Sequence, residues 1–210
     1  MSEMRKFGTF SEVRKKALGD LASFKTRAEG EKKYIEGYFA VFNSIYDMWP
    51  GATESIAPGA FANTLGGDVR ALIDHETRLV LGRNSAGTLE LREDSHGLWG
   101  SIEINPNDLD AMNLYARVQR GDVDQCSFGF EIVKEDTEVR DDGSIHWTIR
   151  EVKLYEVSIV TFPAYEDTAV KARKKDADQI RQRSLESWKA RTKQRLRGAN
   201  CNGTESTDPA

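Results

Sequence analysis

A cysteine and a serine lie side by side in the hexapeptide QCSFGF at 125–130, and either side chain could act as a nucleophile. Alternate side chains of an extended segment point to opposite faces. Cys126 therefore shares a face with the two phenylalanines, where we expect it to be buried as a small apolar residue. Ser127 shares the other face with Gly129, which leaves room for another backbone. The pattern fits a serine nucleophile beside a docked substrate, and it equally fits a strand-end serine that hydrogen-bonds locally.

A serine nucleophile needs a base, and the chain has three histidines. His75 ends the strand-like segment VRALIDH and opens into a polar stretch, a position suited to a cleft. Strand alternation predicts that it shares a face with Ala71 and Ile73. His96 lies in a predicted turn and His146 early in a predicted strand, where we expect packing or surface roles.

A carboxylate interrupts the apolar segment KLYEVSIVTF near the end of the last predicted strand. Burying an unpaired carboxylate is costly, so Glu156 needs a partner. That partner is either an imidazole or a nearby cation such as Arg150 or Lys153. Alternation places Ser158 on the same face as Glu156. The opposite face carries Tyr155, Val157 and Ile159.

Other kinds of chemistry find little support in the sequence. It contains no glycine-rich phosphate loop and no HExxH motif, and Cys126 and Cys201 lie far apart. We therefore expect no metal site, no cofactor and no disulfide, in a reducing compartment. No run approaches the roughly 18 apolar residues of a membrane span, and the N-terminus resembles no secretory signal.

The middle of the chain predicts an α+β fold dominated by strands. Aromatic and β-branched residues mark a strand over 34–43, and hairpins are expected around 94–97 and 141–143. One helix is predicted within 105–121, capped by Asn105 or Asn107 and ended by Gly121. We expect its apolar face to consist of Leu109, Met112, Tyr115 and Val118.

Two arms flank this body, which gives the predicted division 1–32, 33–170 and 171–210. Residues 9–27 have helical apolar spacing, and AEGEKK reads as a linker. The segment 171–197 has 11 Lys/Arg against 3 Asp/Glu in a chain of net charge −4, so a basic helix follows an acidic body. This tail predicts docking onto an acidic scaffold, contact with DNA, or a solvated helix without function. Its last residues, 198–210, are predicted to be disordered.

Four segments in this order resemble one family. YIEGYFAVFNSIYD…ESIAPGAF, ALIDHETRLVLGR, QCSFGF and YEVSIVTFPAY are similar to the prohead (procapsid maturation) serine proteases of tailed bacteriophages, which are distantly similar to the herpesvirus assemblins. The resemblance spans about 34–168 and implies an assemblin-like β-barrel surrounded by helices. It implies Ser127 as nucleophile, His75 as general base and Glu156 as the acid that orients His75. Gly129 and Phe128, beside Ser127 in the hexapeptide, are expected to contact substrate.

The resemblance also implies a role. The expected substrates are the major capsid protein and its scaffold, bound by edge pairing, and the protease itself, with self-association as a further contact. The expected site of action is the assembling procapsid in the host cytoplasm. Composition breaks suggest self-cleavage near 28–33 or 168–176. TFPAYEDTAV lacks the arginine that assemblins use for the oxyanion, so backbone N–H groups are expected there. The alternative is a non-catalytic assembly factor; an esterase is disfavoured because GxSxG is absent.

Overall fold

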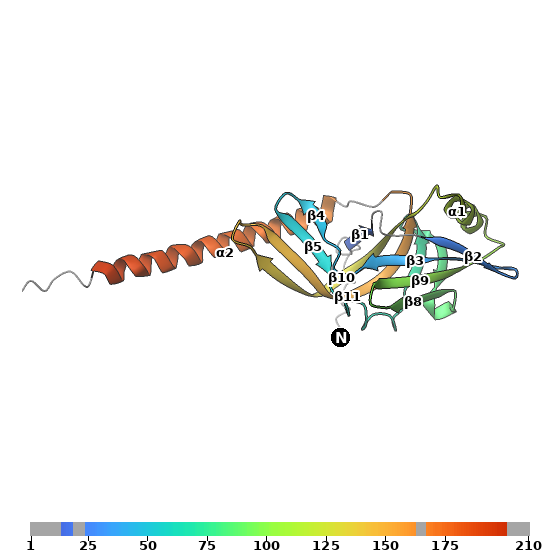
Figure 1. The fold of residues 1–210 in the computed structure, drawn as a ribbon, viewed down its shortest axis with the longest axis horizontal. Helices are drawn as coiled ribbons and strands as arrows, with labels where there is room; N and C mark the ends of the chain where they lie inside the picture. Colours follow the sequence, from blue (N-terminus) through green and yellow to red (C-terminus); the bar gives the residue numbers. More distant parts are fainter. Residues whose placement is uncertain (1–13, 19–23, 163–166, 201–210) are drawn as a thin grey trace, which may run out of the picture. The chain divides into compact units, whose positions relative to one another are not determined.

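The computed structural model describes residues 14–18, 24–162 and 167–200, and the chain divides into two compact units, Met1–Ala169 and Val170–Ala210. Strands make up most of the first unit, and one helix forms the second (Figure 1). In chain order the elements are β1 (Arg14–Leu18), β2 (Lys25–Glu29), β3 (Lys32–Val41), β4 (Tyr46–Trp49), β5 (Ala52–Ile56), β6 (Arg70–Ile73), β7 (Glu76–Arg83), η2 (Asn84–Ala86), β8 (Leu89–Glu93), β9 (Gly97–Ile104), α1 (Leu109–Arg120), β10 (Gln125–Val139), β11 (Ile145–Val160) and α2 (Asp167–Asn200).

The strands of the first unit form two sheets, so the prediction of a strand-dominated α+β fold is confirmed. One sheet has the order β1-β10-β11-β5-β4, with β6 and β7 attached to it through β11. The other has the order β2-β3-β9-β8. The early part of β11 pairs with β5 and its late part with β6, both in parallel. No ring of pairings closes among the described strands, which form two open sheets.

The helix predicted over 9–27 is wrong where the chain is described. Residues 14–18 form β1 on β10, and residues 25–29 form β2 on β3. The ladder hydrogen bonds of two sheets outweigh a helical pattern that Gly19 already weakens. Phe24, which lies within the range predicted as helix, packs edge-on against Phe39 at 5.2 Å between ring centroids.

The predicted linker AEGEKK is also a piece of regular structure. It forms the end of the β2–β3 hairpin, in which Glu29 pairs with Lys32 across a two-residue turn. Gly30 has φ +62°, a left-handed conformation that glycine adopts without steric cost. A glycine between two polar strands is therefore a turn signal here, not a linker signal.

Helix α1 is confirmed, with one change at its start. Asp108, not Asn105 or Asn107, is the N-cap, and its carboxylate accepts hydrogen bonds from the N–H groups of Asp110 and Ala111. Asn105 instead accepts from the N–H of Asn107 in the preceding turn. Gly121 ends the helix at φ +81° as predicted. Tyr115 and Val118 are buried and Met112 partly so, but Leu109 is exposed.

The hairpins predicted around 94–97 and 141–143 are both present. Asp94 closes the first by accepting from the N–H groups of His96 and Gly97. The second joins β10 to β11 through Gly143, at φ +78°. These two long strands pair with each other in the larger sheet. Ser127 lies on β10 and Glu156 on the paired segment of β11.

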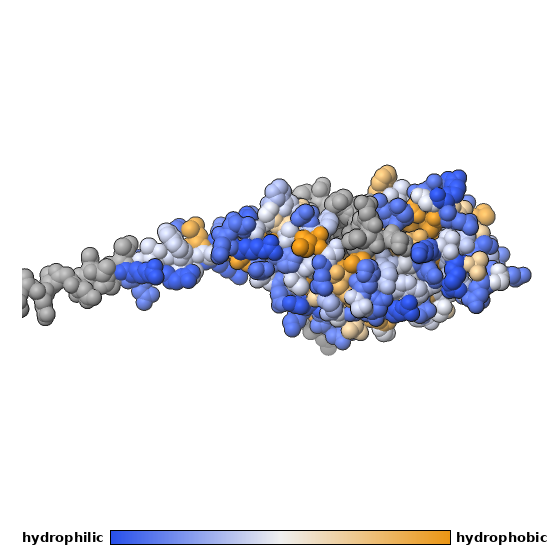
Figure 2. All heavy atoms as spheres, viewed as in Figure 1, coloured by the Kyte–Doolittle hydropathy of each residue, from blue (hydrophilic) through white to orange (hydrophobic). Residues whose placement is uncertain are grey.

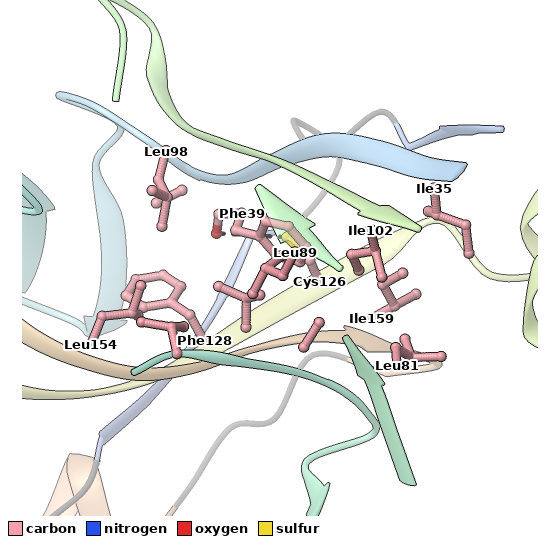
Figure 3. Packing of buried hydrophobic residues seen from close by; sticks show 14 of the residues in the cluster. Ile35, Phe39, Leu81, Leu89, Leu98, Ile102, Cys126, Phe128, Leu154 and Ile159 are labelled. Carbon is pink, nitrogen blue, oxygen red and sulfur yellow. Dashed lines mark hydrogen bonds between the residues drawn. The ribbon is translucent and has the colours of Figure 1, made fainter. Parts of the chain in front are cut away.

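The core lies where residues of both sheets meet (Figure 3). Phe128 stacks on Phe130 at 4.9 Å between centroids and meets Phe61 edge-on at 5.7 Å. Ile35, Phe39, Leu98 and Ile102 contribute from the smaller sheet. Each such fully buried side chain stabilises the fold by about 1.5–3 kcal/mol, which makes the backbone of β10 at the hexapeptide a rigid support.

The second unit contains α2, whose described surface is mostly hydrophilic (Figure 2). The apolar residues Leu185 and Trp188 of this helix are about half exposed. Within the described ranges, no helix is both long and apolar enough to cross a membrane. The C-terminal stretch from 201, including Cys201, lies outside the described residues.

Candidate active site

The side chains of the hexapeptide on β10 alternate as predicted, but the face of Ser127 is buried rather than open. Cys126 is fully buried, with its Sγ 3.3 Å from the carbonyl oxygen of Tyr38. Phe128 is fully buried as well, so its side chain lies in the core and only its backbone is left for substrate. Ser127 points to the opposite face and stands directly across from Ser158 in β11. Cys126 is thus a packing residue, and Ser127 is the nucleophile candidate.

His75 does not end a strand; it lies in a tight turn between two strands. β6 ends at Ile73, and Ile73 pairs with Glu76 at the start of β7. Asp74 and His75 are the two turn residues, with φ of +47° and +62°. Positive φ at both positions marks a type I′ hairpin turn, which is normally filled by Asn-Gly. The expected alternation with Ala71 and Ile73 is therefore wrong, because the left-handed turn redirects the imidazole.

Backbone strain of this kind persists only where surrounding contacts hold it. The N–H of Asp74 donates to the carbonyl oxygen of Ile159 at 3.0 Å, and its carboxylate accepts from the N–H of Thr161 at 2.8 Å. Both bonds fasten the turn to the end of β11. The turn is consequently fixed beside the strand that carries Glu156.

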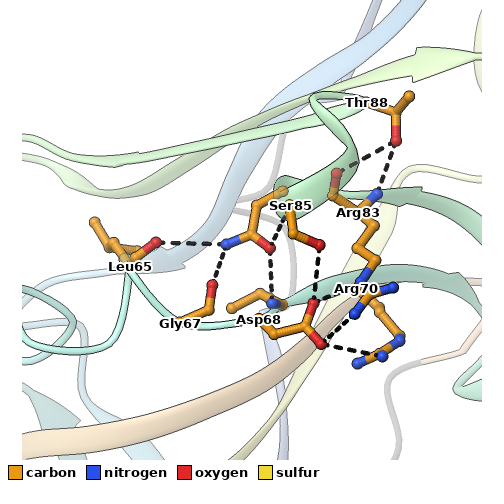
Figure 4. Close-up of polar contacts among 9 residues, drawn as sticks. Leu65, Gly67, Asp68, Arg70, Arg83, Ser85 and Thr88 are labelled. Atoms are coloured by element: carbon orange, nitrogen blue, oxygen red, sulfur yellow. Dashed lines mark hydrogen bonds and ion pairs between the residues drawn. The ribbon is translucent and has the colours of Figure 1, made fainter.

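A polar cluster closes the other end of the same hairpin (Figure 4). Arg83 donates two hydrogen bonds of 2.6 Å to Asp68, and Arg70 lies 3.1 Å from the same carboxylate. The bidentate bonds from Arg83, with the charge of Arg70, lower the pKa of Asp68 to about 2. Asn84 accepts from the N–H of Val69 at 2.9 Å and ties η2 to the loop before β6. The cluster therefore stays ionised near neutral pH and fixes the hairpin that presents His75.

Glu156 is the partner of His75. Its Oε1 lies 2.7 Å from Nδ1 of His75, and the two side chains are only 13% and 7% exposed. The cations considered as alternatives are engaged elsewhere: Arg150 binds Asp136, and Lys153 lies over the ring of Tyr155. The imidazole of His75 therefore supplies the partner that the mostly buried carboxylate of Glu156 requires.

A bulge next to Glu156 changes one detail of the predicted alternation. Gly129 pairs with Glu156 but Phe130 pairs with Leu154, so Tyr155 has no partner on β10. Leu154 enters the core, whereas Tyr155 turns to donate to Glu131 at 2.8 Å. Bulges commonly re-aim side chains beside active sites.

The sequence missed the role of Ser158. Its hydroxyl donates to Oε2 of Glu156 at 2.6 Å, and it is fully buried. Both carboxylate oxygens are thus held, one by the imidazole and one by this hydroxyl. Strand alternation correctly placed Ser158 on the same face as Glu156, but it did not predict the hydrogen bond between the two side chains.

Gly129 has a different neighbour from the one the sequence suggested. A Cβ at this position would lie 2.5 Å from Oε1 of Glu156. The missing side chain therefore makes room for the carboxylate that binds His75. A backbone does approach Gly129 in the plane of the sheet, where Lys15 of β1 is its register partner.

Two atoms that could take part in the reaction have no hydrogen-bond partner among the described residues. They are Oγ of Ser127 and Nε2 of His75, and both are buried. A carboxylate only accepts hydrogen bonds, so Nδ1 of His75 carries its hydrogen and Nε2 is left with a free lone pair. This is the tautomer that a general base requires.

The remaining histidines lie elsewhere. His96 packs edge-on against Tyr38 at 4.5 Å between centroids, and His146 lies within hydrogen-bond distance of the hydroxyls of Thr53 and Ser55. Within the described residues, no group of three His, Cys, Asp or Glu is arranged to hold a metal ion.

Replacing Gly129 by alanine tests the fit of the carboxylate. The new methyl would displace Oε1 of Glu156 from His75, and misplacing a catalytic group by about 1 Å can cost about 100-fold in rate. We expect kcat for peptide cleavage to fall by about that factor with little change in melting temperature. The matched control is Gly66→Ala, because a Cβ there meets no atom within 4 Å. Equal rates for the two variants would contradict this role of Gly129.

Known proteins share this sequence pattern. A family model described as caudovirus prohead serine protease matches residues 22–183, a range that includes Ser127, His75 and Glu156. The chain is 32% identical over 182 residues to the prohead protease of Enterobacteria phage HK97, covering 84% of this chain and 76% of that protein. Among solved structures, the bacteriophage T4 capsid assembly protease matches with a TM-score of 0.39 and 10% identity, over 70% of this chain and 98% of that one.

Proposed function

The chain belongs to the caudovirus prohead serine proteases, and on this premise we propose that Ser127, His75 and Glu156 are its nucleophile, general base and orienting acid. The chain is accordingly a serine peptidase of phage capsid maturation. The observation that carries the triad is the 2.7 Å contact between His75 and Glu156 on the sheet face of Ser127. The free Nε2 of His75 and Oγ of Ser127 supply the two atoms between which a proton must pass.

The proposed reaction proceeds through an acyl-enzyme. Nε2 of His75 takes the proton of Ser127 as Oγ attacks the scissile carbonyl, and the C–N bond then breaks as the imidazolium returns that proton to the leaving amine. Nε2 of His75 then takes a proton from a water molecule that attacks the acyl carbon; the bond between that carbon and Oγ breaks, the imidazolium returns the proton to Oγ, and the acid is released. Glu156 stabilises the imidazolium through Nδ1, and backbone N–H groups are proposed to stabilise the oxyanion.

Ser158 is proposed to position Glu156 rather than to touch substrate. A hydrogen bond to a charged group contributes about 1.5–3 kcal/mol, which corresponds to about a tenfold or larger loss when it is removed. We expect Ser158→Ala to lower kcat by that factor with KM unchanged. A double-mutant cycle with Glu156→Gln measures the coupling. If Ser158→Ala lowers kcat by the same factor in the Glu156→Gln chain as in the wild type, Ser158 does not act through Glu156.

We propose that the substrates are the major capsid protein and its scaffold, cleaved inside the procapsid in the host cytoplasm. The density of Lys and Arg in α2 supports docking of this helix onto an acidic scaffold; DNA is the weaker candidate. Co-expression with the capsid protein and scaffold of the same phage tests this proposal. Cleavage fragments must appear with the wild-type chain, and their absence would contradict it.

The bounds of the protease domain and its barrel architecture are further parts of the proposal. Because β2 pairs with β3, we propose that the protease domain includes β2 and ends near 170, before a separate basic tail. The assemblin-like barrel is proposed from the family resemblance alone, because the two open sheets of the described strands do not confirm it. The suggested self-cleavage positions 28–33 and 168–176 lie in the β2–β3 hairpin and in α2. Cleavage at either would require local unfolding, since proteases bind extended chains.

A further inference from the structure

A glutamine carboxamide lies on the same strand face as the nucleophile. Gln125 is the first residue of β10, and it pairs with Val160 of β11 as Ser127 pairs with Ser158. This pairing has no register shift between Gln125 and Ser127, so both side chains point to one face and Cys126 points to the other. Gln125 is therefore the next side chain along this face from Ser127, towards the start of β10.

The two sides of Ser127 on this face carry different groups. On the side of Gly129, the carboxylate of Glu156 lies in the space next to the glycine and binds His75. On the other side lies the carboxamide of Gln125. The acid of the proposed triad and the carboxamide are thus on opposite sides of the nucleophile.

Buried polar atoms without a partner are concentrated around the nucleophile. Four buried side-chain atoms lack a hydrogen-bond partner in the described part of the chain, and three of them are Oε1 of Gln125, Oγ of Ser127 and Nε2 of His75. The fourth, Oγ of Ser144, lies in the β10–β11 hairpin. Proteins pair the large majority of such atoms, so a group of three is explained by a molecule that binds there and supplies the partners.

One partner that the reaction requires is a donor for the oxyanion. When a nucleophile attacks a peptide carbonyl, its oxygen becomes negatively charged and needs donors at about 2.7–3.1 Å. The described side-chain donors of β11 and β6 on this face are already engaged. Ser158 gives its hydrogen to Glu156, and Arg70, the register partner of Glu156, contacts Asp68.

The carboxamide of Gln125 has the donor and the length for this task. At a rise of about 3.3 Å per residue, Gln125 and Ser127 are about 6.6 Å apart along β10. Two methylene groups and the amide cover most of that distance. A carboxamide carries an NH₂ group as well as an oxygen, and a half-turn about its last side-chain bond exchanges the two in the same space. Nε2 can therefore take the buried position that Oε1 holds without a partner.

We propose that Gln125 is a catalytic residue whose Nε2 donates a hydrogen bond to the oxyanion. This inference rests on the proposed role of Ser127 as nucleophile, and it adds a side-chain donor to the backbone N–H groups. As Oγ of Ser127 bonds to the carbonyl carbon, the π electron pair of the C=O group moves onto the oxygen, where Nε2 stabilises it. The pair returns when the C–N bond breaks and the amine leaves. Gln125 neither gains nor loses a proton.

Two substitutions in the full-length chain test this role. Gln125→Met and Gln125→Glu keep about the length of the side chain, and both remove the NH₂ donor. The matched control, Gln119→Met, makes the same change at an exposed position of α1. The readouts are kcat and KM for cleavage of the purified capsid protein and scaffold of the same phage, and the rate at which a fluorophosphonate labels Ser127. The pH dependence of kcat/KM is measured for Gln125→Met.

We expect kcat to fall by about 100- to 1000-fold in both variants, as for the loss of one oxyanion donor in a well-studied protease. KM should stay within about twofold of the wild type, because the hydrogen bond is made only as charge develops. Labelling of Ser127 should slow in parallel, since the fluorophosphonate also gathers negative charge on its oxygen. The pH midpoint of Gln125→Met should equal that of the wild type, and Gln119→Met should match the wild type throughout.

Several results would overturn the inference. Wild-type kcat in Gln125→Met would exclude a donor role. A raised KM with unchanged kcat would make Gln125 a group that binds the substrate before reaction. Activity kept in Gln125→Glu but lost in Gln125→Met would assign the effect to shape and polarity, and a shifted pH midpoint would assign it to His75. Failure of both variants to fold would make Gln125 structural.

The proposed function fails by a different result. If the fluorophosphonate does not label Ser127 in the wild type or in Gln119→Met, Ser127 is not the nucleophile. Labelling of Ser127 that is equally fast in the wild type, Gln119→Met and Gln125→Met would keep the nucleophile and remove only Gln125 from the site.

Discussion

Ser127→Ala is expected to abolish capsid-protein cleavage while leaving the fold at least as stable as the wild type. Loss of a serine nucleophile costs about 10⁶-fold in kcat in a well-studied protease, so no product should be detectable. Oγ of Ser127 is buried without a described partner, and removing such a group relieves a desolvation cost of about 1 kcal/mol. The melting temperature should stay equal or rise by about 2–4 °C. Cleavage in co-expression and thermal unfolding by circular dichroism measure both effects.

The neighbouring residue provides the matched control. Cys126 is fully buried among core side chains, so Cys126→Ala should leave cleavage intact and lower stability by removing packed atoms. The two substitutions thus have opposite effects on activity and stability. Cleavage that survives Ser127→Ala but disappears in Cys126→Ala would reverse the assignment of the nucleophile.

Glu156→Gln is expected to have the second-largest effect. The amide keeps the shape of the side chain but loses the charge that stabilises imidazolium, and its NH₂ group can donate to Nδ1 of His75 and favour the wrong tautomer. The corresponding acid-to-amide change in a serine protease triad lowers kcat by about 10⁴-fold. We expect a loss of about 10³- to 10⁴-fold, measured as the initial rate of capsid-protein cleavage.

A carboxylate outside the site controls for a general effect of lost charge. Asp136 contacts Arg150 at 2.7 Å on the exposed part of β10, and Asp136→Asn should leave the rate unchanged. The Glu156→Gln chain should keep its melting temperature within a few degrees, because Ser158 can still hydrogen-bond to the amide. A rate equal to that of the wild type would remove Glu156 from the triad.

The sequence alone predicted local structure correctly in segments where a single strand or helix periodicity dominates. Alternation in the hexapeptide correctly separated Cys126 from Ser127, because two phenylalanines fix which face packs into the apolar core. The face of Ser127 is buried as well, which alternation did not predict. The helix α1 was evident from its apolar spacing and from Gly121, although the capping residue was misplaced. Asp142 and Gly143 indicated the β10–β11 hairpin through turn chemistry alone.

Other features depend on pairings that no local pattern contains. β1 and β2 form because β10 and β3 offer them ladder partners, whereas the local sequence has a weak helical period. The Asp74–His75 turn has positive φ at two residues that are not glycine, which is uncommon, so the segment was predicted as a continuous strand. The sequence predicted that the missing side chain of Gly129 makes room for a substrate. The Glu156 carboxylate fills that space instead, and its position depends on the register between β10 and β11, which local sequence does not give.

Ser127 is proposed to be a nucleophile that His75 activates. Its most direct test is to incubate the full-length chain with a fluorophosphonate and locate the adduct by tandem mass spectrometry. We expect a single adduct on Ser127 that is absent from His75→Ala. An adduct on another residue, or undiminished labelling of Ser127 in His75→Ala, would contradict it.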